Sequence, residues 1–204
     1  GSVYLKPSGG MGTLRIDTHL TAADSTPRAL TPLGIPGDTT FQVERLVIAG
    51  RYSVAVPERA GLAIQGDEIV IESGGALSHR AASAAEVFTL DVTTGTLTID
   101  SNSESRIALT GKGYLPGRTA GNTTSGAAQD FSGGSYGGEG FVPTASSGRT
   151  NRAYGDYRNP IEPGSGGGLH LTWSAGSGGG VVKITATFAT INGSILANGG
   201  NRVY

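Results

Sequence analysis

The densest group of aromatic and arginine side chains lies in the glycine-rich second half of the chain. The group comprises Arg152, Tyr154, Tyr157, Arg158 and Trp173. Exposed aromatic rings beside polar groups suit sugar binding, and aromatic and arginine side chains also anchor protein interfaces. The group therefore predicts a binding site for an extended glycan or a partner surface. The alternative is that the rings form the packing core of this segment, which offers few other apolar anchors.

Carboxylates in the same region allow two further kinds of chemistry. They are Asp130, Glu139, Asp156 and Glu162. A glycosidase or lyase needs paired carboxylates, and nearby arginines (Arg149, Arg152 and Arg158) can neutralise an acidic sugar. Calcium takes about six to eight oxygen ligands, and the candidates to supply them are Asp130, Glu139 and Asp156 with the free backbone carbonyls. EF-hand spacing is absent, and a turn role is the alternative for Asp156.

Most other catalytic and cofactor motifs are missing. The three histidines show no HxH or HExxH spacing, and the chain has no P-loop and no complete GxGxxG. With no cysteine, disulfides, thiolate metal sites and a cysteine nucleophile are excluded. We therefore expect no enzyme activity and no cofactor, calcium being the one candidate.

Composition narrows the partners and the setting. The 204 residues carry a net charge of −1, and the 15 basic residues are scattered, which disfavours nucleic acid as a partner. No stretch approaches the ~20 apolar residues of a membrane helix, so membrane insertion is not expected. The initial Gly1-Ser2 is typical of a cloning remnant, which predicts a fragment of a larger protein.

Short apolar pairs recur along the first half of the chain. Leu46/Ile48, Val54/Val56, Leu62/Ile64 and Ile69/Ile71 follow one another at spacings of eight, eight and seven residues. Turn-forming residues such as Gly50, Pro57 and Gly66-Asp67 separate the pairs. Strands this short and this closely spaced favour an all-β fold, namely a right-handed parallel β-helix (solenoid) in which like residues stack from coil to coil.

The pattern also predicts an organisation along the chain. We expect one domain over 1–204, with an N-terminal coil or cap and an irregular loop at 1–40 and β-helix coils at 41–111. A long, ordered glycine-rich excursion at 112–180 is expected to pack on one flank, and 181–204 rejoins the β-helix. The side chains predicted to point inward are Leu46, Ile48, Leu62, Ile64, Ile69, Ile71, Leu97, Ile99, Ile107, Leu109, Val182 and Ile184.

Glycine is dense in the excursion, with 15 in the 50 residues from Phe131 to Gly180. Because glycine tolerates positive φ, we expect positive φ at several of these glycines. The candidates are Gly133, Gly134, Gly137, Gly138 and Gly166–Gly168.

A series of motifs in the second half carries a family resemblance. In order, they are SYGG at Ser135–Gly138, YGD at Tyr154–Asp156 with Pro160 nearby, GSGGG at Gly164–Gly168, GGVVKI at Gly179–Ile184 and INGSILANG at Ile191–Gly199. This series resembles the glycine-rich, right-handed parallel β-helix regions of large bacterial surface and secreted proteins, often called adhesin-like. The resemblance implies a β-helix on an exported, multidomain protein at the bacterial cell surface or outside the cell. It implies no specific activity.

Three functions remain open from the sequence. The first is a non-catalytic structural or adhesive module of a bacterial cell-surface or secreted protein that contacts glycans or partner proteins. The second is a polysaccharide-active β-helix enzyme, a lyase or glycosidase, or a carbohydrate-binding module. The third is homotypic assembly, in which one solenoid end stacks on another copy.

Overall fold

The computed structural model describes residues 1–19, 30–144, 147–170 and 175–201. The chain divides into two compact units. Unit 1 combines Gly1–His79, Leu90–Ala108 and Ile184–Leu196, and unit 2 combines Arg80–Thr89, Leu109–Lys183 and Ala197–Tyr204. Each unit is built from segments far apart in the sequence.

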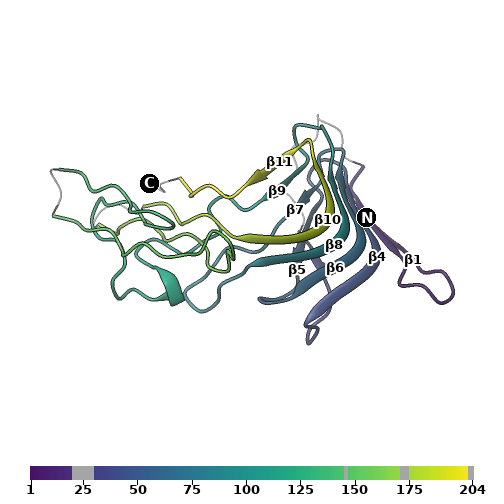
Figure 1. Cartoon of the computed structure of the whole chain (residues 1–204), viewed down its shortest axis with the longest axis horizontal. Coiled ribbons are helices and arrows are strands. Elements are labelled where there is room, and N and C mark those ends of the chain that lie inside the picture. The colour runs from purple at the N-terminus through teal and green to yellow at the C-terminus, as the bar shows by residue number, and fades with distance from the viewer. Residues whose placement is uncertain (20–29, 145–146, 171–174, 202–204) are drawn as a thin grey trace. The chain divides into compact units, whose positions relative to one another are not determined.

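Unit 1 is formed by two β-sheets between which the chain alternates from β2 onward (Figure 1). The six-stranded sheet has the order β1 (Ser2–Leu5), β2 (Thr13–Asp17), β4 (Thr40–Ala49), β6 (Ala63–Glu72), β8 (Leu90–Ile99) and β10 (Val182–Ile191). The five-stranded sheet has the order β11 (Ser194–Leu196), β9 (Arg106–Ala108), β7 (Ala76–Leu77), β5 (Val54–Pro57) and β3 (Leu30–Leu33). Only the first two residues of β10 belong to unit 2. Strands β1 and β2 pair antiparallel, whereas the successive pairs from β2 to β8 and from β3 to β11 are parallel.

The predicted right-handed parallel β-helix, with a glycine-rich excursion on its flank, is wrong. The described residues form two mostly parallel sheets and no closed solenoid, and their only helix is the short η1 (Ala120–Asn122). The prediction relied on strands of three to five residues, but β4, β6, β8 and β10 each have ten. Ile64, Ile69 and Ile71 were assigned to two strands, yet all three lie in β6.

A shared bend in three neighbouring strands explains the wrong strand lengths. The register of β4, β6 and β8 is interrupted at Glu44, Asp67 and Gly95, which lie at the same level. Along a regular strand, every second side chain lies on the same face. Beyond a residue that is left out of the pairing, the side chains that were on the exposed alternate positions take the buried positions. Ile64 and Ile69 are accordingly both fully buried although they are an odd number of residues apart. The turn-forming residues therefore bend the strand without ending it.

Stacks of aliphatic side chains build the core of unit 1. The register places Ile16 beside Ile48, Ile48 beside Ile71 and Ile71 beside Ile99, and all four are buried. Burial of the predicted inward residues is confirmed for ten of them, which are Leu46, Ile48, Leu62, Ile64, Ile69, Ile71, Leu97, Ile99, Ile107 and Leu109. Val182 and Ile184 are half-buried because they lie in β10, the edge strand of the six-stranded sheet.

Unit 2 is held together by backbone hydrogen bonds between extended segments. Segment 111–118 bonds to 164–168, for example from Tyr114 N to Gly164 O at 3.0 Å. The same two segments both bond to 176–180, through Gly113 N to Gly178 O at 2.8 Å and Gly164 N to Gly179 O at 2.9 Å. Three segments that all bond to one another cannot be neighbours in one flat sheet, where the two partners of a strand lie on opposite sides. Between β9 and β10, the described residues form no further β-strand.

Close backbone contact, more than positive φ, explains the glycines of unit 2. Among the glycines predicted to have positive φ, only Gly137 lies in the left-handed region. At Gly134, Gly166 and Gly168, a Cβ atom would instead overlap backbone atoms of a neighbouring segment. Glycine is needed at these positions because the segments approach one another closer than any side chain allows.

The aliphatic stack predicts a graded cost of truncation. Replacing Ile71 with alanine should lower the free energy of unfolding by about 3 kcal/mol, because the cavity left among fully buried neighbours cannot collapse. Ile191→Ala is the matched control, since this isoleucine lies in the edge strand β10 with 46% of its surface exposed and should cost less than about 1.5 kcal/mol. Urea unfolding of both variants measures the difference. Equal losses would contradict the stacked core.

The glycine contacts predict a steric effect in unit 2. Gly178→Ala should destabilise the protein by about 1–3 kcal/mol, because the added methyl group would overlap the carbonyl of Gly164. Gly138→Ala is the control, since its Cβ would find the nearest atom at 3.9 Å and its φ is not positive. Thermal unfolding of the two variants checks this. A Gly178→Ala protein as stable as Gly138→Ala would show that the segments can move apart freely.

Candidate ligand-binding site

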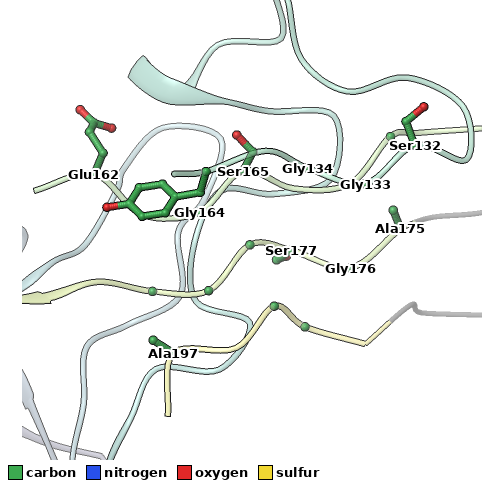
Figure 2. Close-up of a pocket in the computed structure, with 18 of the residues that line it drawn as sticks. Ser132, Gly133, Gly134, Glu162, Gly164, Ser165, Ala175, Gly176, Ser177 and Ala197 are labelled. Atoms are coloured by element: carbon green, nitrogen blue, oxygen red, sulfur yellow. The ribbon is translucent and has the colours of Figure 1, made fainter. Parts of the chain in front are cut away.

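A large cavity lies within unit 2, and glycine is the most frequent residue in its lining. Its volume is about 820 Å³, which is within the range of small-molecule sites. Four stretches of chain line it, at 130–136, 160–170, 175–182 and 197–200. Figure 2 shows Glu162 and Ser132 at opposite ends of the labelled upper row, with mostly glycine between them. Because so little side chain lines this cavity, its few polar and aromatic groups determine its chemistry.

Ser132 belongs to the lining of this cavity, but its hydroxyl is itself buried. The residue is 2% exposed and its backbone is fixed, since Ser132 N donates to Gln129 O and Ser132 O accepts from Gly168 N at 2.8 Å. Its Oγ has no hydrogen-bond partner, which is unusual for a buried polar group.

Glu162 offers the cavity a carboxylate that is already held in place. Its Oε2 accepts a hydrogen bond from the hydroxyl of Tyr114, and Gly121 N in turn donates to that hydroxyl at 3.2 Å. Within the described part of the chain, Oε1 of Glu162 accepts no hydrogen bond. One carboxylate oxygen therefore fixes the side chain, and the other is available as an acceptor.

Three tyrosines surround this carboxylate and stay protonated well above neutral pH. Burial, followed by the hydrogen bond to Glu162, raises the pKa of Tyr114. Burial also raises the pKa of Tyr154, to about 12. Burial and the negative charge of Glu162 together raise the pKa of Tyr136. The rings of Tyr136 and Tyr154 meet edge-on with centroids 5.3 Å apart. Tyr136 also lines the cavity, so the hydroxyls around Glu162 are neutral hydrogen-bonding groups at neutral pH.

An aromatic pair lines another part of the cavity. The rings of Phe131 and His170 stack with centroids 4.5 Å apart and an angle of 26° between their planes. Phe131 remains 52% exposed, so the ring is only partly covered. A half-exposed ring beside polar groups can pack against the apolar face of a sugar.

Of the aromatic and arginine residues predicted to bind a ligand, the four that the structure describes do not line this cavity. Tyr154 is half-buried, donates to Pro163 O at 2.6 Å and lines a second cavity of about 480 Å³ together with Arg152. Tyr157 is 82% exposed, and the Arg158 guanidinium lies 4.8 Å from its ring centroid. Trp173 lies outside the described residues. Tyr154 thus packs within its own segment, as the alternative interpretation of the aromatic group expects. A ligand-binding role for the group stays a prediction.

The three candidate calcium ligands are not brought together. No group of three or more His, Asp or Glu side chains that could hold a metal occurs in the described residues. Asp156 Oδ1 accepts from Arg158 N at 2.9 Å, which is the turn role given as its alternative. Asp130 Oδ2 accepts from Ser147 Oγ at 3.3 Å, and Asp130 lines the large cavity. Glu139 is exposed, and calcium binding stays a prediction.

One serine has the GxSxG spacing of a hydrolase nucleophile but a structural environment. Ser135 in GGSYG at 133–137 is buried, and its Oγ donates to Asn151 O at 2.6 Å and accepts from Gly140 N at 3.0 Å. The Asn151 amide also bonds back to Ser135 O. Because the Ser135 hydroxyl bonds to these two backbone groups, it links segment 133–140 to Asn151. Ser132, in contrast, carries no motif signal, because only the fold shows that its hydroxyl is unpaired.

Comparison with known proteins leaves the family resemblance untested. No protein-family model, curated protein or solved structure matches this chain. Within the described residues, no helix has the length and apolar character needed to cross a membrane.

The tyrosine cluster predicts a fall in stability at high pH. Folded Tyr154 keeps its proton up to about pH 12, whereas the same group in the unfolded chain loses it near its ordinary pKa of 10. The unfolded state then binds fewer protons, so the free energy of unfolding decreases as the pH rises from about 10 to 12. Ultraviolet titration should show a tyrosinate step near pH 12 that Tyr154→Phe removes and the exposed-site variant Tyr157→Phe retains. A step that survives in Tyr154→Phe would refute the assignment.

Proposed function

We propose that the protein is a non-catalytic binding module that contacts an extended glycan through the large cavity of unit 2. The observation that carries the proposal is the half-exposed Phe131 ring, stacked on His170, at a cavity that Glu162 also lines. A sugar presents hydroxyls around its rim and C–H groups on its faces. It can therefore pack against the partly exposed phenylalanine and hydrogen-bond to polar groups of the lining at the same time.

The glycine-lined walls favour an extended ligand. Residues of the segments 164–168 and 176–180, most of them glycines, line the cavity along much of their length. Such a surface has few side chains and repeats along its length, which suits a repeating polymer better than a compact molecule. The hydrogen bonds between the segments fix this surface before a ligand arrives, so little ordering is needed on binding.

The biological setting rests on the resemblance of the sequence motifs. We assign the module to a bacterial cell-surface or secreted protein, where a glycan-contacting unit would serve attachment. The acidic residues leave a polysaccharide-cleaving enzyme as the competing function, because Asp130 and Glu162 both line the cavity. A turnover assay on the same polysaccharides that bind distinguishes the two, since a binding module releases its ligand intact.

The ring pair supplies the test. On a glycan array, Phe131→Ala should reduce binding about tenfold or more, because the exposed ring face is lost, while the thermal midpoint changes little. Phe141→Ala is the matched control: this phenylalanine is 75% exposed, lies in unit 2 and does not line the cavity, so binding should persist.

A third variant distinguishes the cavity from the exposed aromatic and arginine group. If Tyr157→Ala abolishes glycan binding while Phe131→Ala does not, the ligand is held by Tyr157 and Arg158 instead. Binding unaffected by any of the three variants would place the contact elsewhere and overturn the proposal.

A further inference from the structure

The charged groups at the large cavity are almost all of one sign. The ionisable side chains that line it are Asp130, Glu162, His170 and the tyrosine Tyr136. Among the described residues that line it there is no lysine or arginine, although the described part of unit 2 contains both residue types. The three arginines considered as partners for an acidic sugar (Arg149, Arg152 and Arg158) are among those that do not line it.

The free oxygen of Glu162 fixes the kind of group that can approach. Oε2 is engaged by the Tyr114 hydroxyl, which leaves Oε1 to accept a hydrogen bond from a ligand. A carboxylate can only accept, so its partner must donate. Sugar hydroxyls and ammonium groups donate, whereas a carboxylate or sulfate on the ligand would face Glu162 acceptor to acceptor.

Partial burial strengthens this discrimination. Charges in a cavity are screened less than charges on an open surface, so a second negative group near Glu162 and Asp130 would be repelled with little relief from solvent. A protonated amine at the same position would be attracted. Hydrogen bonding and electrostatics therefore favour the same ligands.

We infer that the cavity selects glycans without negative charge and prefers those that carry protonated amines, with Glu162 as the specificity-determining residue. This inference rests on the proposed glycan-binding function and adds the class of ligand. Glu162 Oε1 meets a donor group of the ligand, while the partly exposed Phe131 ring packs against the sugar.

Three tetrasaccharides of matched length test the inference by calorimetry at mildly acidic pH. They are built from glucosamine, N-acetylglucosamine and galacturonic acid. The amine should bind most tightly, the neutral sugar next and the uronic acid at least about tenfold more weakly than the neutral sugar. Added salt should reduce the preference for the amine over the neutral sugar. Uronic acid binding equal to or tighter than neutral binding would overturn the inference while leaving glycan binding intact. Binding of none of the three would count against the proposed function itself.

Substitution of Glu162 assigns the selectivity to this residue. Glu162→Gln keeps an acceptor for Tyr114 and removes the charge. The ratio of the affinities for the glucosamine and galacturonic acid tetrasaccharides should therefore fall severalfold. Glu139→Gln removes an exposed carboxylate of unit 2 outside the cavity and should leave the order unchanged. Should Glu162→Gln unfold in a thermal melt, Asp130→Asn tests the negative charge of the cavity instead, because Asn tolerates the positive φ of 53° at this cavity-lining position. Unchanged selectivity in folded Glu162→Gln would refute the assignment to Glu162. Unchanged selectivity in Asp130→Asn would contradict an effect of the cavity's negative charge.

Discussion

Direct contact between glycine backbones is the constraint on which unit 2 and its cavity depend. Segments 111–118, 164–168 and 176–180 bond to one another through main-chain N–H and C=O groups. At Gly113, Gly166 and Gly178, a Cβ would overlap a neighbouring backbone. The unit therefore obtains much of its cohesion from hydrogen bonds, whereas unit 1 uses stacked aliphatic side chains. The two units apply different physical solutions to the same task of joining extended segments of the chain.

This construction concentrates the chemistry of the cavity in few side chains. Where the wall is glycine, each remaining group has a large effect, and each is held by a specific contact. Tyr114 holds Glu162, the backbone bonds of Ser132 hold its hydroxyl, and His170 stacks on Phe131. A rigid wall with a small number of fixed acceptors suits recognition, because the binding groups need no reordering when a ligand enters.

The roles of the aromatic residues follow from burial. Tyr154 looked like a ligand-binding ring, but its hydroxyl bonds to Pro163 and Ser165 and its ring packs against Tyr136. Tyr157, three residues later, is exposed. Neighbours in sequence with the same side chain thus differ in role because one faces the interior of unit 2 and the other faces solvent. The spacing of residues in an irregular segment does not indicate which face they share.

By itself, the sequence determined most of the side chains of unit 1 that are buried, because alternation of apolar residues reports the inner face of a strand. It did not determine that Gly66-Asp67 bends β6 instead of ending it, since a turn-forming residue is compatible with both outcomes. The β-helix prediction failed at that point. The cavity was decided by tertiary structure alone, because its walls come from four separate stretches of the chain.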